Sequence, residues 1–147
     1  MIPADQKIVD QALAILSYAH QPGKTLESSQ ETEEFLRLKL AEHKNELFGC
    51  MFLTNRHAVI AIEEIFFGTI DGASVYPRVV VQKALENNAA AVILYHNHPS
   101  GVAEPSKADE QITQRIKDAL ALVDVRVLDH IVVSTDECVS FADRGLI

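Results

Sequence analysis

Two stretches near the start of the chain have the hydrophobic spacing of amphipathic helices. Gln21-Pro22-Gly23 ends the first stretch, and Ser28-x-x-Glu31 has the form of a capping box, so a second helix is predicted from there to about residue 44. In residues 4–20 the apolar side chains recur at intervals that place them on one helical face. They are Ile8, Val9, Ala12, Leu13, Ile15, Leu16 and Ala19.

The middle of the chain predicts three strands. Residues 47–53 form an apolar run whose length and content suit a buried strand, and residues 54–57 form a turn. Residues 58–62 are then the second arm of a hairpin. Glu63 and Glu64 interrupt the apolar pattern, so residues 65–70 are predicted as a third strand that ends at Asp71-Gly72.

Helices and strands alternate in the second half of the chain. Pro77 lies near the first turn of a helix predicted at 78–87, and the apolar run 89–95 is typical of a central strand buried on both faces. A helix at 107–123 precedes a strand at 125–133 and a short strand at 139–141. This order predicts an α/β fold, a three-layer sandwich with a mixed central sheet flanked by helices.

A loop rich in histidine follows the predicted central strand. His96 and His98 are separated by one residue, which brings both imidazoles near one point, and Asp109 could return to that point from the start of the next helix. Two imidazoles and one carboxylate suit zinc, and three protein ligands leave a fourth position for water, as in catalytic zinc sites. Ligands in open α/β sheets also tend to lie beyond the carboxyl ends of strands.

The same residues have structural roles available to them. The two histidines could end the strand and bond to loop carbonyl groups. Ser106-x-x-Asp109 has the form of a helix cap, which taken alone is the commoner role for such a carboxylate. Capping and ligation do not exclude each other, because a carboxylate in the first helical turn can face outward to a metal. From spacing alone, both interpretations stay open.

Composition narrows the class of protein. A chain of 147 residues fits one domain, and its 48% apolar and 23% charged residues are those of an ordinary soluble globular protein. There is no apolar run long enough to span a membrane and no signal peptide, and Cys50 and Cys138 are expected to be free thiols, so a cytoplasmic location is expected. The net charge of −8 argues against direct nucleic-acid binding.

The spacing His96-x-His98-Pro99, Ser106 and Asp109 resembles the JAMM motif of MPN+ metalloproteases, and the wider sequence resembles the RadC family in particular. The resemblance runs from about residue 26 to the C-terminus, so we divide the chain into an N-terminal helix and turn, 1–25, and a RadC-like domain, 26–147. It is similar to short RadC-like proteins without a helix-hairpin-helix portion. Zinc deaminases share the layout, but their His-x-Glu and Pro-Cys-x-x-Cys ligands are absent here. The segments that carry the resemblance are His96-Asn97-His98-Pro99-Ser100-Gly101, Phe67-Gly68-Thr69-Ile70-Asp71, Val75-Tyr76-Pro77-Arg78, Asn88-Ala89-Ala90-Ala91, Leu128-Asp129-His130-Ile131, Ser140-Phe141-Ala142-Asp143 and Gly145-Leu146.

The resemblance implies a role for each matching residue. His96, His98 and Asp109 match the zinc ligands, and Ser106 matches the serine that helps to stabilise the tetrahedral intermediate. Glu46, between a helix and a strand, is the best match for the glutamate that acts as general base.

Four further residues have open interpretations. Glu63 and Glu64 are rivals to Glu46 as the base, although surface charge in a hairpin is their plainer interpretation. Tyr95 stands where a small residue is usual; it could narrow the site, but packing on the core is favoured. His130 could orient a ligand or be an ordinary strand histidine, whereas His20, His43 and His57 are expected at the surface.

The sequence is compatible with three candidate functions. The leading expectation is a zinc-dependent hydrolase of peptide or isopeptide bonds that acts on an unidentified protein or peptide. A non-catalytic MPN scaffold is the second, and a DNA repair or recombination factor, suggested mainly by the family name, is the third. The apolar N-terminal helix could pack within the chain or against another copy, which would make a homo-oligomer.

Overall fold

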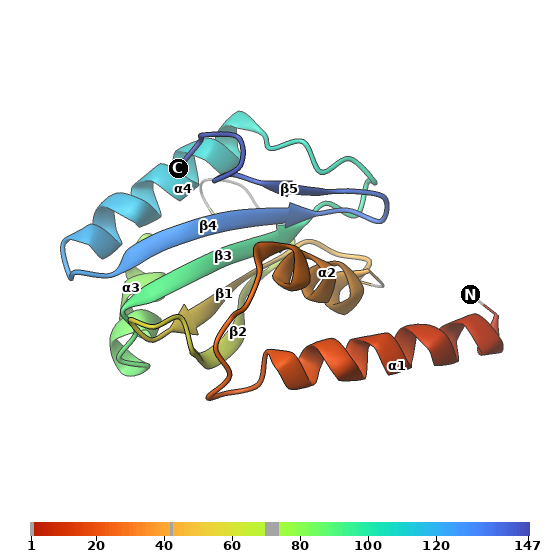
Figure 1. Ribbon diagram of the computed structural model, residues 1–147. Coiled ribbons are helices and arrows are strands. Elements are labelled where there is room, and N and C mark those ends of the chain that lie inside the picture. Colours follow the sequence, from red (N-terminus) through yellow and green to blue (C-terminus); the bar gives the residue numbers. More distant parts are fainter. Residues whose placement is uncertain (1, 42, 70–73) are drawn as a thin grey trace.

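Five strands form one mixed sheet in the order β2-β1-β3-β4-β5 (Figure 1). The structure, a computed structural model, describes residues 2–41, 43–69 and 74–147. β3 and β4 run parallel, and the other neighbouring strands are antiparallel. The bounds are β1 Leu47–Leu53, β2 Val59–Phe67, β3 Ala91–Asn97, β4 Arg126–Val133 and β5 Cys138–Ser140.

Helices cover both faces of the sheet and make the predicted three-layer α/β sandwich (Figure 1). On one face, Phe35 and Leu36 pack against the sheet, with Leu13 and Leu16 beside them. On the other face, Val80 and Ile116 pack against a separate set of strand residues. The four helices are α1 Pro3–Ala19, α2 Ser29–Leu40, α3 Pro77–Glu86 and α4 Lys107–Ala121, of which α1 and α2 lie on the first face and α3 and α4 on the second.

β3 is buried along its whole length, as its apolar run predicts, and it extends two residues further than residue 95. Successive side chains point to opposite faces, so Val92, Leu94 and His96 turn toward α4. Ile93 and Tyr95 turn toward α2. The extension matters for the site, because His96 lies inside the strand and pairs with Phe48 of β1 and Val132 of β4.

The prediction of separate strands at 58–62 and 65–70 is wrong, because Val59–Phe67 is one continuous strand. β2 lies at the edge of the sheet, where charged side chains are tolerated because they reach water. Glu63 pairs with Lys83 of α3 at 3.4 Å and accepts a hydrogen bond from Asn87 at 2.8 Å. Ile70 and the predicted strand end at Asp71-Gly72 lie outside the described residues.

The N-terminal helix is joined to the sheet by the segment that follows it. Near the start of β2, the Lys24 carbonyl oxygen accepts from Val59 N–H, and Leu26 N–H donates to the His57 carbonyl oxygen. His20 was expected at the surface, but it is buried, stacks on Phe35 and lies 3.0 Å from the Thr32 hydroxyl. The division of the chain at residue 26 stays a prediction.

Tyr95 is a core residue and does not line the His-rich loop. Its ring is fully buried on the α2 face, opposite to His96, and its hydroxyl donates to the Glu63 carbonyl oxygen at 3.5 Å. Burial raises the pKa of this hydroxyl well above its ordinary value. Gly49 lies directly across from Tyr95 in the β1–β3 pair, and a Cβ atom there would be 2.3 Å from the Tyr95 ring. A large ring is therefore accommodated because its neighbour has no side chain.

Gly49→Ala is expected to destabilise the protein by about 1–3 kcal/mol, the usual cost of overpacking a core. The clash is with a buried ring that has little room to move. Urea unfolding followed by circular dichroism measures the loss. In the double variant Gly49→Ala/Tyr95→Leu the clash is removed, so its loss should be smaller than the sum of the two single losses. Additive losses would contradict this explanation.

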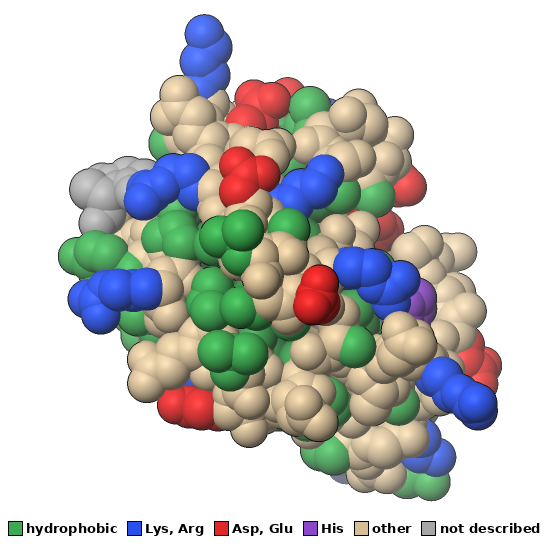
Figure 2. All heavy atoms as spheres, turned by 90° about the vertical axis from the view of Figure 1, so that its left-hand side faces the viewer, with side chains coloured by type: hydrophobic (Ala, Val, Ile, Leu, Met, Phe, Trp, Pro, Cys, Tyr) green, Lys and Arg blue, Asp and Glu red, His purple; other side chains and the backbone are tan. Residues whose placement is uncertain are grey.

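The surface mixes charge of both signs with apolar groups. On the face in Figure 2, Lys and Arg side chains stand apart from one another among acidic, hydrophobic and uncharged atoms. Such a face lacks the clustered positive charge that typically binds a nucleic-acid backbone. Among the described residues, no helix is long and apolar enough to cross a membrane.

Candidate metal centre

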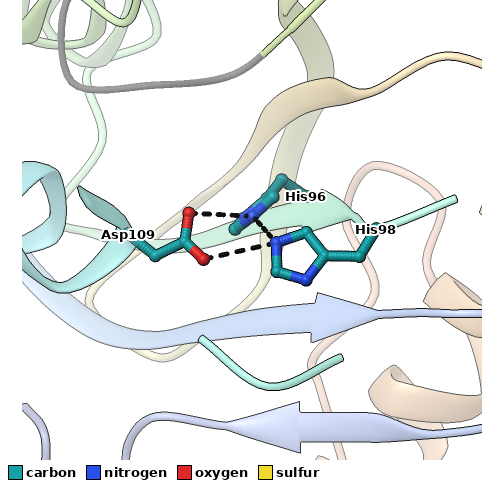
Figure 3. Close-up of side chains that lie close together, drawn as sticks. All are labelled: His96, His98 and Asp109. Carbon is teal, nitrogen blue, oxygen red and sulfur yellow. Dashed lines mark hydrogen bonds and ion pairs between the residues drawn. The ribbon is translucent and has the colours of Figure 1, made fainter. Parts of the chain in front are cut away.

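Two histidines and one aspartate converge at the end of β3 (Figure 3). His96 Nε2 lies 2.8 Å from His98 Nε2 and 3.2 Å from Asp109 Oδ1, and His98 Nε2 lies 3.2 Å from Asp109 Oδ2. All three groups point to one position. His96 and Asp109 are buried, whereas the side chain of His98 is 15% exposed and gives the cluster a way out to solvent.

The end of β3 explains how the two histidines come together. Residues two apart on a strand point to the same face, so His96 and His98 share the side toward α4. His98 lies just beyond the strand, and its backbone N–H donates to the Val133 carbonyl oxygen at 2.7 Å. This bond continues the β3–β4 pairing by one step and fixes the direction of the second ring.

Asp109 both caps α4 and faces the histidines. The Ser106 hydroxyl accepts from Asp109 N–H at 3.0 Å, and Asp109 Oδ2 accepts from Ser106 N–H at 2.8 Å, which completes the predicted capping box. The same carboxylate lies within 3.2 Å of both imidazoles. The cap thus holds the carboxylate in place beside the histidines, so capping does not prevent Asp109 from facing the site.

The close contact between Asp109 and the two histidines shifts the pKa values of Asp109 and His98. Burial by itself would raise the pKa of Asp109, but hydrogen bonds from His96 and His98 outweigh it and hold that pKa far below its usual range. For His98, the hydrogen bond with Asp109 raises the pKa most; burial opposes it, and the bond to Val102 and the charges of Asp109 and Glu46 add to the increase. The carboxylate is therefore ionised at neutral pH.

The donor set fits a divalent metal ion. His98 Nδ1 lies 2.9 Å from the Val102 carbonyl oxygen, which can only accept, so this nitrogen carries a proton, and in the neutral ring the lone pair of Nε2 faces the cluster. Ligands of a tetrahedral zinc ion, at about 2.0–2.1 Å from the metal, lie roughly 3.3 Å apart. The two histidine nitrogens are 2.8 Å apart, and each lies 3.2 Å from a different oxygen of Asp109, so the separations are of this order.

Glu46 lies at the same end of the sheet as His98. Phe48 pairs with His96 in antiparallel register, so two steps outward on the two strands lead to Glu46 and to His98. The Glu46 charge contributes to the raised pKa of His98. Glu46 also borders a hollow of about 380 Å³ together with Thr69, Pro99 and Ser100.

Asn97 holds the segment that carries Glu46 and was missed in the sequence. Its side-chain oxygen accepts from Leu47 N–H at 2.7 Å, and its amide nitrogen donates to the Asn45 carbonyl oxygen at 3.1 Å. These two bonds bracket Glu46 on either side. A signal was present, because a polar residue between two histidines at a strand end must point to the opposite face and find partners there.

The rival glutamates lie elsewhere. Glu63 is engaged with Lys83 and Asn87 on the edge strand, and Glu64 pairs across the sheet with Gly49, one step further from the His-rich end than Phe48. Ser106 lies in an exposed position at the start of α4. Its hydroxyl oxygen accepts the cap bond, and a hydroxyl that accepts can still donate its proton to another group.

His130 and Thr113 extend the cluster into the core. His96 Nδ1 lies 2.8 Å from His130 Nε2, and His130 Nδ1 lies 2.6 Å from the Thr113 hydroxyl, which is 2.7 Å from the Asp109 carbonyl oxygen. Burial lowers the pKa of His130 well below its ordinary value, with the nearby His96 as the next cause. Thr113 was not singled out in the sequence, although it lies four residues after Asp109 and so shares its helix face.

The two thiols take no part in this cluster. Cys50 and Cys138 are free, and burial raises the pKa of both, to about 12 for Cys138. A thiol with a raised pKa is a weak nucleophile and a weak metal ligand near neutrality. Among the described residues, the cluster that could hold a metal ion consists of His96, His98 and Asp109.

Comparison with known proteins defines the family. A family model described as "RadC-like JAB domain" matches residues 26–146, and the chain belongs to that family. It is similar to UPF0758 proteins of Thioalkalivibrio sulfidiphilus (58% identity, 97% of this chain and 63% of the relative), Nitrosococcus oceani (62%, with 85% and 56%) and Vibrio cholerae (52%, with 96% and 89%). The chain thus spans less than two thirds of the length of the Thioalkalivibrio and Nitrosococcus relatives, and most of the length of the Vibrio relative.

Proposed function

We propose that this protein is a zinc-dependent metallohydrolase that cleaves peptide or isopeptide bonds in a protein or peptide substrate. The observation that carries the proposal is the convergence of His96, His98 and Asp109 on one position, with Glu46 at the adjoining strand end. Two neutral imidazoles and one carboxylate make an open site of the kind that catalytic zinc ions occupy.

Each residue then has a distinct role. When bound, a zinc ion in such a site lowers the pKa of a coordinated water to about 7 and polarises a carbonyl oxygen. Glu46 accepts the proton of the attacking water and delivers it to the leaving amine, as a general base that becomes a general acid. The Ser106 hydroxyl donates to the negative charge that develops on the carbonyl oxygen. Asp109 keeps the two rings in position through its paired oxygens.

Two hollows beside the cluster suit an extended substrate. One, of about 310 Å³, is lined by His98 and Pro99 with Leu40 and Val133; the other, of about 380 Å³, borders Glu46. Lys44 and Pro99 line both. A substrate polypeptide lying across Pro99 would present the bond to be cleaved between the general base and the exposed edge of His98. This arrangement favours a polymer over a small enclosed molecule, which usually binds in a deep apolar pocket.

Metal analysis and peptide cleavage test the proposal together. The purified protein is expected to contain close to one zinc ion per chain and to cleave a mixture of fluorogenic peptides and isopeptide-linked conjugates, with activity lost on chelation and restored by zinc. A protein without zinc and without affinity for it would favour the scaffold function instead. A protein that holds zinc but cleaves neither class of bond would contradict the proposed reaction.

Zinc affinity is expected to fall as the pH is lowered from 8 to 6. His98 must lose its proton to bind a metal, and its pKa lies above the ordinary value of 6.5, whereas Asp109 stays ionised throughout this range. Below the pKa of His98, competition by the proton weakens binding by up to about tenfold per pH unit. Titration of zinc against a competing chelator at several pH values measures the slope. An affinity that does not vary with pH would contradict it.

A further inference from the structure

A chain of buried polar groups leads from the metal centre into the core between α4 and β4. It runs from His96 Nδ1 to His130 Nε2, from His130 Nδ1 to the Thr113 hydroxyl, and from there to the Asp109 carbonyl oxygen, with distances of 2.8, 2.6 and 2.7 Å. All four residues are buried, and His130 is fully so. This series of hydrogen bonds begins at the side chain of one proposed metal ligand and ends on the backbone of another.

These bonds can run in two directions. In the first, Thr113 O–H donates to the Asp109 carbonyl oxygen, His130 Nδ1–H donates to the Thr113 oxygen, and His96 Nδ1–H donates to His130 Nε2. His96 Nε2 is then bare and faces the cluster. In the second, every donor and acceptor is exchanged between His96 and Thr113, and His96 carries its proton on Nε2, toward Asp109 Oδ1.

Only the first direction leaves His96 able to bind a metal through Nε2. It requires an acceptor for the Thr113 proton, and the Asp109 carbonyl oxygen at 2.7 Å is that acceptor. It also requires an acceptor for the proton on His96 Nδ1, which is His130 Nε2. Stacking on Phe141 and an edge contact with Phe48 hold the His130 ring between these partners.

We propose that His130 and Thr113 are positioning residues that set the tautomer of His96 for metal binding. This inference rests on the metal centre of the proposed function. Groups that orient a metal-binding histidine typically contribute about 10- to 100-fold to metal affinity. Here the orienting group is a second histidine, whose own tautomer is set by a threonine hydroxyl and, through it, by the first turn of α4.

Nitrogen-15 NMR of the histidine rings in the zinc-loaded wild-type protein reads the tautomers directly. We expect a proton on Nδ1 of both His96 and His130, and a bare Nε2 on His130. This measurement needs no variant and no substrate. A His130 ring protonated on Nε2 in the zinc-loaded protein would overturn the proposal, because it could not then accept from His96.

Zinc affinity of matched variants provides the second test. Thr113→Val keeps the shape of the side chain but removes the hydroxyl, so it should weaken zinc binding about tenfold or more, and His130→Phe should weaken it by up to about 100-fold. Thr113→Ser keeps the hydroxyl and should stay within about threefold of the wild type. Thr32→Val is the control, because it removes a buried hydroxyl that contacts a different histidine, His20, on the other face of the sheet.

The outcomes separate this inference from the proposed function. Wild-type affinity in a folded Thr113→Val variant, confirmed by circular dichroism, would overturn the role of the threonine even if the enzyme is active. Equal losses in Thr113→Val and Thr32→Val would point to general destabilisation and overturn it as well. The expected tautomers and affinities in a protein that cleaves nothing would support the inference and contradict only the hydrolase. A wild type that binds no zinc would overturn both.

Discussion

Glu46→Gln is expected to lower the rate of hydrolysis by about 100- to 10,000-fold while zinc stays bound. The amide has nearly the shape of the carboxylate but cannot accept the proton of the attacking water at neutral pH. Zinc binding should persist, because the proposed ligands are His96, His98 and Asp109. Steady-state cleavage of a peptide substrate, measured together with the zinc content of the same sample, tests both parts.

Glu64→Gln is the matched control for this experiment. Glu64 is an exposed carboxylate on the edge strand β2, which pairs with the strand that follows Glu46. Its amide variant should keep wild-type activity. Full activity in Glu46→Gln, or an equal loss in both variants, would contradict the assignment of Glu46 as the general base and reopen the choice between the three glutamates.

Asp109→Asn is expected to weaken zinc binding by more than the roughly 10- to 100-fold that is typical for groups outside the ligand set, and to remove hydrolysis with it. The amide loses the negative charge that faces both histidines at 3.2 Å. Its oxygen can still accept from Ser106 N–H, so the cap of α4 should largely survive. Zinc titration and thermal unfolding on one sample separate the loss of the ligand from the loss of the cap.

Glu110→Gln provides the comparison, because Glu110 is an exposed carboxylate next to Asp109 in the same helical turn. It should leave zinc affinity unchanged apart from a small loss of stability at the helix N-terminus. Asp109→Asn with wild-type zinc affinity would show that Asp109 is only a helix cap. That is the role which its sequence pattern, taken alone, makes the commoner one.

Local patterns predicted most of the fold. The side-chain cap at Ser28 and the capping box at Ser106 open α2 and α4, and the apolar runs give β1 and β3. These features depend on residues a few positions apart, so they can be read from one segment at a time. The wrong prediction of a strand break at Glu63-Glu64 also came from reading one segment at a time. Whether two charges interrupt a strand depends on its place in the sheet, and β2 is an edge strand.

The sequence by itself predicted which residues meet at the candidate metal centre. His96-x-His98 at a strand end and Asp109 at a helix start are short-range arrangements, since strand alternation and the helix cap set their directions locally. The family resemblance, which the comparison bears out for residues 26–146, added Ser106 and Glu46 as expectations.

Only the tertiary structure decided how distant segments meet at the site. The register of β1 against β3 brings Glu46 beside His98, and the parallel pairing of β3 with β4 sets His130 beside His96. The absence of a side chain at Gly49 leaves room in the core for the Tyr95 ring. Such contacts join residues separated by about 30 to 50 positions. Strand order, register and packing against α4 determine which residues meet, and the sequence around each residue does not indicate its partner.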